Sequence, residues 1–209
     1  MRNLIKCCLT ALCFCVVLLT PGSSKAQNWD IDLLKQINPS QPGSSVWKGF
    51  SSTAKPISVG LPAVMLATAM LNKDSLLKSR SLEILGSVVL TTVATEAIKI
   101  VVNRERPYRK YPLEVFPNDA SENGKSMPSA HVSLAFATAT SLSLVYHKWY
   151  VTVPAFVWAS GVGYSRLYLG EHYPSDVIAG AAVGIAGAYA NRWLQKKLWP
   201  DHKKRLIPR

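Results

Sequence analysis

The sequence predicts an all-α protein, a bundle of about five long apolar helices that is embedded in a membrane and follows an N-terminal signal peptide. Three observations carry this prediction. Apolar segments of helical length alternate with short polar segments along the chain. Basic residues gather in the segments that one membrane topology places inside. The chain also begins with a pattern typical of export signals.

Residues 1–26 have the pattern of a signal peptide. Arg2 and Lys6 flank the apolar run 7–19, and Ser24-Lys25-Ala26 offers small residues where a peptidase cuts. The run is short for a bilayer with about 30 Å of hydrocarbon, which takes about 20 apolar residues to cross. Cleavage is therefore favoured, with a retained first membrane helix as the alternative.

The cysteines all lie within this leader, so the mature chain has no thiol for a disulfide, a zinc site or a catalytic nucleophile. The remaining residues, 27–209, suit one domain with a sizeable core. No repeat or low-complexity tract indicates a second domain. The cysteines are Cys7, Cys8, Cys13 and Cys15.

Five apolar segments follow a polar stretch over residues 28–53. Their lengths and their content of Ala, Leu and Gly favour helices over strands. Short polar turns separate them, so they are expected to pack as a bundle. The segments are 56–71, 84–102, 132–146, 150–164 and 177–190.

Charge predicts the orientation of this bundle. With the mature N-terminus outside, five crossings place residues 72–83, the His147-Lys148 turn and the C-terminal tail inside, and these segments are predominantly basic. The same topology places residues 103–127 and 166–175 together on the outer face. A soluble helical core is the alternative, because the apolar segments are slightly short and rich in Ser, Thr and Ala.

The net charge of +12 is consistent with nucleic-acid binding, but the basic residues do not form a stripe along amphipathic elements. They gather in the C-terminal tail and in one central loop. No nucleic acid is therefore expected to bind, and the central loop needs a chemical explanation. Its basic residues are Arg104, Arg106, Arg109, Lys110 and Lys125.

Two groups of residues offer the chemistry of an anion site. Lys99 and Arg106 combine a mobile point charge with a fixed fork of donors, which together suit a phosphoryl group. Ser129 is placed as the N-cap of the helix that begins with Ala130 and His131, and the N–H groups of a first helical turn attract anions. In isolation, a lysine paired within its helix and an ordinary helix cap are the better explanations of these two groups.

A third group is Ser165-Arg166, followed by His172 and Asp176. His172 and Asp176 are four residues apart, so they share a helix face if the turn at Tyr173-Pro174 starts a helix. A carboxylate bonded to one imidazole nitrogen fixes the tautomer and leaves the other nitrogen as a nucleophile. A purely structural capping pair is the alternative interpretation.

The three groups occur in a fixed order, as Lys99-Ile-Val-Val-Asn-Arg-Glu-Arg106-Pro107, then Pro128-Ser129-Ala130-His131, then Ser165-Arg166-Leu-Tyr-Leu-Gly-Glu-His172-Tyr-Pro-Ser-Asp176. This pattern resembles the three-part motif of the type 2 phosphatidic acid phosphatase superfamily. The resemblance covers the chain from about Asp30 to Leu198. Ala130 departs from it, since the family usually has a glycine there, and a site that needed a positive φ at this position would be distorted.

The resemblance implies a role for each motif residue. His172, held by Asp176, would attack phosphorus, and His131 would protonate the leaving oxygen and then activate water. The other motif residues would bind the phosphate, with no metal and no cofactor. They are Lys99, Arg106, Ser129, Ala130 and Arg166.

The resemblance therefore implies a metal-independent phosphatase of the bacterial inner membrane, with a periplasm-facing site and a phosphohistidine intermediate. The implied partners are the membrane and a phosphorylated lipid, either phosphatidylglycerol phosphate, an isoprenoid pyrophosphate or a lipid A phosphate; the sequence carries no signal for an oligomeric state. Three alternatives stay open. They are a soluble periplasmic acid phosphatase, a vanadate-dependent haloperoxidase, and a phospholipid-binding pseudoenzyme in which Ala130 has compromised turnover.

Overall fold

The computed structural model describes residues 24–120 and 124–198. Within these ranges the chain is helical and contains no strand, which confirms the predicted all-α fold. Residues 1–23 of the predicted signal peptide lie outside the described ranges, as does most of the basic C-terminal tail.

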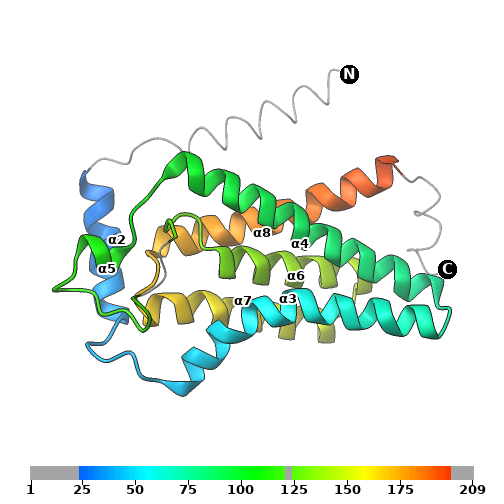
Figure 1. Cartoon of the computed structure of the whole chain (residues 1–209), viewed down its shortest axis with the longest axis horizontal. Helices are drawn as coiled ribbons and strands as arrows, with labels where there is room; N and C mark the ends of the chain where they lie inside the picture. Colours follow the sequence, from blue (N-terminus) through cyan, green and yellow to red (C-terminus); the bar gives the residue numbers. More distant parts are fainter. Residues whose placement is uncertain (1–23, 121–123, 199–209) are drawn as a thin grey trace.

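Five long helices form a bundle and correspond to the five predicted apolar segments (Figure 1). The observed helices are longer than those segments, because polar residues at their ends continue the helical hydrogen bonding. The helices are α3 (Ser45–Leu71), α4 (Ser75–Val102), α6 (Ala130–Tyr146), α7 (Trp149–Tyr168) and α8 (Pro174–Leu198).

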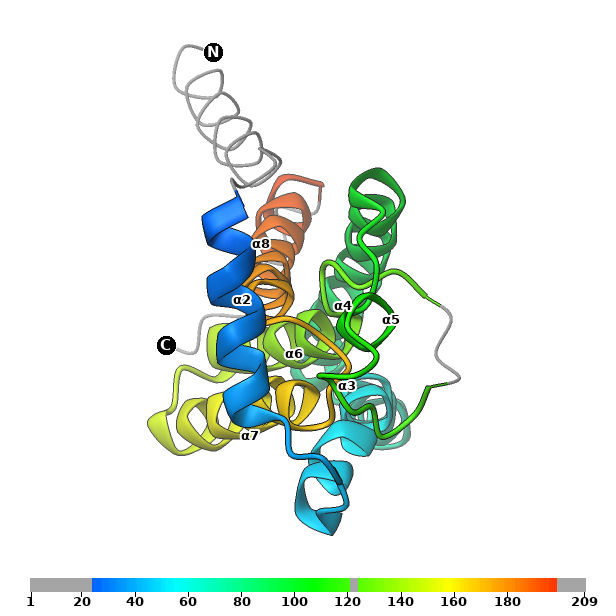
Figure 2. The ribbon, with the colours of Figure 1, turned by 90° about the vertical axis from the view of Figure 1, so that its left-hand side faces the viewer.

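Two shorter helices, α2 (Ser24–Ile37) and α5 (Pro107–Lys110), lie at one end of the bundle, with α2 running across it (Figures 1 and 2). The sequence interpretation missed α2, because residues 28–53 read as a polar stretch. One face of α2 is nevertheless apolar. Ile31 and Leu34 are buried in a cluster with aromatic residues of α5 and of the α7–α8 link, so α2 is anchored on this end of the bundle.

Helix α6 lies at the centre of the bundle, in contact with α3, α4, α7 and α8 (Figure 2). Its fully buried residues are small, including Ala135 and Ala137, and they allow neighbouring helices to approach closely. Helix α8 meets α6 through Gly180 and Gly184, which lie against the backbone of α6 and of its N-cap. The close α6–α8 contact brings the start of α8 to the start of α6.

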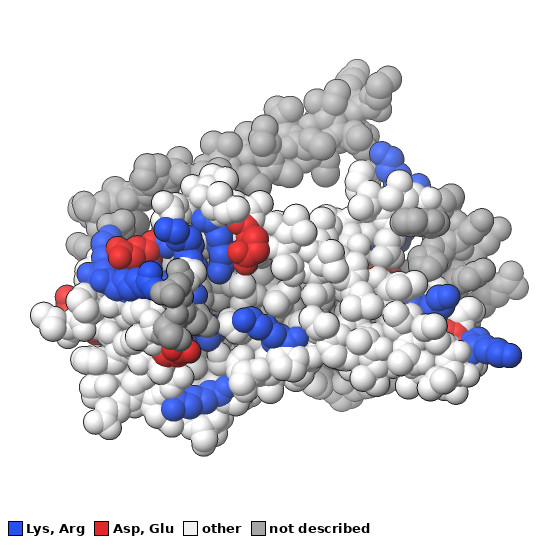
Figure 3. Space-filling view, viewed as in Figure 1, with Lys and Arg blue, Asp and Glu red and all other residues white. Residues whose placement is uncertain are grey.

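The bundle carries large apolar side chains on its surface and small polar side chains in its interior. Val64 and Ile100 are mostly exposed, whereas the hydroxyl-bearing side chains of Ser87, Thr91 and Thr138 are fully buried. On the face shown in Figure 3, charged side chains gather mainly toward the two ends of the long axis, and the surface between them is largely uncharged. Two segments of the described chain are long and apolar enough to cross a membrane, namely Ser45–Leu71 and Ser75–Lys110.

The substitution Gly184→Ala is expected to destabilise the bundle. The new Cβ would lie 2.3 Å from the carbonyl oxygen of Ser133 and 2.9 Å from the amide nitrogen of Ala137, so α6 and α8 would have to separate. Overpacking of this kind costs about 1–3 kcal/mol. Thermal unfolding should therefore occur at a lower temperature for this variant.

The matched control is Gly60→Ala in α3, because a Cβ at Gly60 meets nothing within 4 Å. Alanine also has the higher helix propensity, so this variant should unfold at the temperature of the parent protein or slightly above it. Equal unfolding temperatures for Gly184→Ala and Gly60→Ala would contradict the close approach of α6 and α8.

Candidate active site

The three motif segments meet at the end of the bundle that α2 crosses. The backbone N–H of Ser129 donates to the carbonyl oxygen of Asp176 at 3.1 Å, which joins the second segment to the third. Arg106 Nη1 donates to the carbonyl oxygen of Glu171 at 3.2 Å, which joins the first segment to the third. Residues as far as 65 positions apart in the sequence therefore surround one small region.

His172 and Asp176 lie at the start of α8, and both are almost completely buried. His172 Nδ1 is 3.6 Å from Asp176 Oδ2. This distance allows electrostatic attraction but is too long for a hydrogen bond. The Ser126 hydroxyl lies between them: it donates to Asp176 Oδ2 at 2.5 Å and is 3.4 Å from His172 Nδ1. His172 and Asp176 therefore lie side by side, as their spacing predicted. Ser126, which the sequence analysis did not single out, contacts both of them.

The imidazole of His172 is held in its neutral form. Burial lowers the pKa of His172 to about 4, and the positive charge of Arg166 acts in the same direction. The Asp176 carboxylate opposes these effects only in part. At neutral pH His172 therefore has one ring nitrogen with an available lone pair, and because Nδ1 faces Ser126 and Asp176, that nitrogen is Nε2.

Arg106 and Arg166 are both buried, and both pair with the same oxygen of the Glu171 carboxylate. Glu171 Oε2 is 3.3 Å from Arg106 Nη1 and 3.8 Å from Arg166 Nη2. Each guanidinium also donates a hydrogen bond to a residue other than Glu171. Arg106 Nε donates to the carbonyl oxygen of Gly124 at 2.9 Å, and Arg166 Nη1 donates to the Ser51 hydroxyl of α3 at 2.7 Å.

Glu171 is the least expected member of this group. Its side chain is 2% exposed, and Oε1 accepts a hydrogen bond from the backbone N–H of Asp119 at 3.1 Å, in the loop between α5 and α6. A carboxylate at this position compensates two buried cations. An incoming oxyanion would have to share the two guanidinium groups with it.

Ser129 is the N-cap of α6, as the sequence predicted. Its hydroxyl is buried and has no hydrogen-bond partner in the described part of the chain, which is unusual for a buried polar group. Ala130 is the first residue of the helix and has no positive φ, so the position does not need a glycine on conformational grounds.

The remaining predicted residues lie close to this region. His131, in the first turn of α6, is partly buried and within electrostatic range of Arg166, His172 and Arg106. Lys99 is partly buried in the last turn of α4, and the loop that carries Arg106 leaves from the end of this helix. All three motif segments therefore contribute polar groups to the same end of the bundle.

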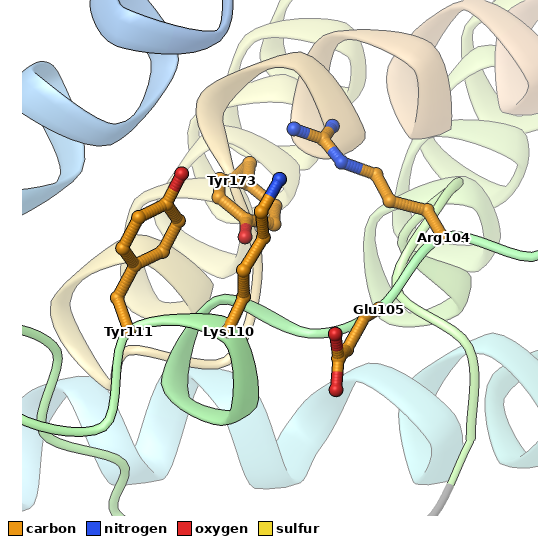
Figure 4. A pocket seen from close by; sticks show the side chains of 5 residues that line it. All are labelled: Arg104, Glu105, Lys110, Tyr111 and Tyr173. Atoms are coloured by element: carbon orange, nitrogen blue, oxygen red, sulfur yellow. The ribbon is translucent and has the colours of Figure 1, made fainter.

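A small cavity of about 160 Å³ lies beside the start of α8 (Figure 4). It adjoins the buried group but is not lined by any of the residues that the motifs predicted. Arg104 and Tyr173 separate it from Asp176, since Arg104 donates to that carboxylate and stacks on the Tyr173 ring. The lining residues are Arg104, Glu105, Lys110, Tyr111 and Tyr173.

Residues 80–200, which contain all three motif segments, match the PAP2 superfamily. The chain belongs to this superfamily. The match confirms the resemblance that the motifs indicated. The match covers more than half of the sequence and leaves α2 and all of α3 outside the matched residues.

Several PAP2-like relatives of known activity are similar to parts of the chain. A lipid A 4'-phosphatase of Bacteroides thetaiotaomicron is 35% identical over 39% of this chain and 36% of its own length. A lipid A 1-phosphatase of Rhizobium etli is 32% identical over 58% and 57%, and an undecaprenyl-diphosphatase of Sulfolobus acidocaldarius is 36% identical over 47% and 47%. The chain thus spans about a third to three fifths of the length of these relatives.

Solved structures share the fold over most of the chain. A transmembrane PAP2 type phosphatidylglycerolphosphate phosphatase from Bacillus subtilis superimposes with a TM-score of 0.74 at 20% identity, covering 91% of this chain and 96% of that one. LpxE of Aquifex aeolicus superimposes with a TM-score of 0.54 at 22% identity, covering 79% and 95%. The helical arrangement is therefore that of PAP2 proteins.

The Glu171→Gln variant is expected to bind inorganic phosphate more tightly than the parent protein. The substitution keeps the shape of the side chain but removes the negative charge that competes for Arg106 and Arg166. A gain of about tenfold corresponds to about 1.4 kcal/mol. Titration calorimetry with inorganic phosphate measures it.

The control for this prediction is Glu105→Gln, which removes an exposed carboxylate next to Arg106 in the sequence. Its phosphate affinity should equal that of the parent protein. Weaker phosphate binding by Glu171→Gln would mean that Glu171 serves only to hold the arginines in place, and the competition described above would be wrong.

Proposed function

We propose that the protein is a phosphatase that hydrolyses a lipid phosphate or pyrophosphate through a phosphohistidine intermediate on His172. The observation that carries the proposal is a buried, neutral histidine, backed by a carboxylate, at the same bundle end as two buried arginines and an unpartnered serine hydroxyl at a helix N-terminus. PAP2 membership and the printed activities of the relatives support it.

In this mechanism Arg106 and Arg166 bind the non-bridging oxygens of the phosphoryl group. The Ser129 hydroxyl and the first N–H groups of α6 complete the cradle, and Lys99 adds positive charge from the end of α4. None of these groups changes its covalent state. Their task is to hold phosphorus in line with Nε2 of His172 and to stabilise the charge that develops on the oxygens.

His172 Nε2 attacks phosphorus, and the bond from phosphorus to the leaving oxygen breaks. His131 supplies the proton that the leaving oxygen takes up. In the second step His131 accepts a proton from water, which attacks the phosphohistidine and releases inorganic phosphate and neutral His172. Asp176 stabilises the positive charge that the His172 ring carries while it is phosphorylated.

We further propose that the bundle is embedded in the bacterial inner membrane with the site on the periplasmic side. The uncharged central surface and the two span-length helices support this placement (Figure 3). Exposed aromatic residues also mark both ends, with Trp29 and Tyr164 near the site and Trp149 and Trp193 toward the opposite end, as at the two interfaces of a bilayer.

The substrate would then be an amphiphile whose phosphate lies at the membrane surface. The candidate lipids are phosphatidylglycerol phosphate, an isoprenoid pyrophosphate and a lipid A phosphate. A soluble acid phosphatase would not require large apolar side chains such as Val64 and Ile100 to be exposed. The pseudoenzyme alternative loses its main support, because Ala130 occupies an ordinary helical position.

The test of this function is phosphate release from a panel of these lipids by detergent-purified protein and by its His172→Ala variant. Loss of the nucleophile should reduce release by at least about a thousandfold, because it abolishes the covalent step. His147→Asn serves as the control. His147 is exposed at the other end of α6 in a left-handed conformation that asparagine accepts, so this variant should keep full activity.

Phosphate release by His172→Ala equal to that of the parent protein would contradict the mechanism. If the parent protein released phosphate from none of the lipids, the proposed function would be wrong. The lipid that is hydrolysed fastest would assign the substrate among the three classes.

The pH profile gives an independent prediction. Only neutral His172 can attack phosphorus, and burial lowers its pKa from the ordinary value of 6.5 to about 4. Activity measured as kcat/KM should therefore persist through pH 6 and fall as the pH drops through about 4, where the imidazole gains a proton. An acid limb at pH 6 to 7 that follows His172 protonation would contradict the buried, neutral nucleophile.

A further inference from the structure

Asp30 brings a buried carboxylate from α2 to the back of the catalytic pair. Its side chain is 5% exposed, and its position lies outside the residues matched by the PAP2 superfamily. Asp30 Oδ2 accepts a hydrogen bond from Arg104 Nη2 at 2.6 Å. The motif pattern did not single out either residue.

Arg104 joins Asp30 to Asp176. Its Nη2 faces Asp30, while Nη1 donates to Asp176 Oδ1 at 2.8 Å and to the Ser175 hydroxyl at 2.6 Å. The guanidinium also stacks on the Tyr173 ring, with 3.8 Å between its central carbon and the ring centroid. Figure 4 shows Arg104 and Tyr173 on the wall of the neighbouring cavity. The planar fork is thus fixed by contacts on both edges and on one face.

Asp30 also holds the first turn of α8, the turn that carries Asp176. Its Oδ1 accepts from the backbone N–H of Ser175 at 2.8 Å, and its Oδ2 accepts from the Ser175 hydroxyl at 2.5 Å. A carboxylate of α2 therefore accepts a hydrogen bond from a backbone N–H in the first turn of α8. At most helix starts, a side chain of the same helix accepts this bond.

From this arrangement we propose that Asp30 is a positioning residue of the active site, which acts through Arg104 and Ser175 to orient the Asp176 carboxylate toward His172. The inference rests on the proposed phosphohistidine chemistry and extends it to α2. Because Arg104 divides its charge between two carboxylates, Asp176 keeps enough negative charge to stabilise the phosphorylated His172 ring. Without Asp30, Arg104 pairs with Asp176 alone and draws it away from His172.

The first test is Asp30→Asn, which keeps an oxygen for the Ser175 N–H but removes the charge that pairs with Arg104. Asp30 does not contact the phosphate-binding residues, so kcat should fall by about 10–100-fold while KM stays within about twofold, as for other residues that orient a catalytic group through a neighbour. The matched control is Asp32→Asn, the same charge change on the exposed face of α2, which should leave both constants unchanged.

A second variant, Arg104→Lys, tests the same connection from its other end. Lysine keeps the charge but lacks the fork that reaches both carboxylates, so kcat should fall by a similar factor. The double variant Asp30→Asn with Arg104→Lys should be no slower than the slower single variant, because both changes break one chain of contacts. If the two substitutions instead lowered kcat independently, so that their fold-losses multiplied in the double variant, the proposal would be overturned.

Wild-type kcat in folded Asp30→Asn would overturn the proposal, and so would a loss that Asp32→Asn reproduces. If Asp30→Asn does not fold, Arg104→Lys decides, since the bonds from Asp30 to Ser175 are kept in it: a fall in kcat at constant KM supports the proposal, and wild-type kcat overturns it. A parent protein that releases no phosphate from any lipid would instead overturn the proposed function itself.

Discussion

The buried carboxylate of Asp176 makes the contacts on which the site end of the bundle depends. A charge that is removed from water must be compensated, and removing one partner of a buried ion pair typically costs about 3–5 kcal/mol. Asp176 accepts from Arg104 of the loop after α4, from Ser126 of the loop before α6, and from the backbone N–H of Tyr173. Two segments distant in sequence, the loop after α4 and the loop before α6, are thereby held at the start of α8, beside His172 and the α6 N-terminus.

Electrostatic balance is the second constraint on this region. The half-buried Arg104 and the buried Arg106 and Arg166 are accompanied by Asp30, Asp176 and Glu171, so each of these cations has a buried carboxylate near it. A site balanced in this way is stable without a bound anion. In the proposed function, these carboxylates would make the site bind phosphate less tightly than unpaired arginines would, which suits an enzyme that must release inorganic phosphate at the end of each cycle.

The helices and the motif residues could be predicted from the sequence because their signals are local. Apolar segments of helical length gave the five long helices, and the order of Lys99, Ser129 and His172 with their neighbours indicated the family. Helix α2 was missed because residues 28–53 were read as a polar stretch, although Ile31, Leu33, Leu34 and Ile37 have helical spacing within it. Asp30 and Glu171 were missed because their partners lie 74 and 65 positions away, and no local pattern reports such contacts.

The central claim is the covalent step on His172, and the most direct measurement is rapid quenching of the enzyme during turnover of a hydrolysed lipid phosphate, followed by mass spectrometry of its peptides. The account predicts phosphate on His172 during turnover, both in the parent protein and in the Asp32→Asn control. Neither protein should carry phosphate when substrate is omitted. Steady turnover with phosphate on another residue, or with no phosphorylated peptide at any quenching time, would contradict it.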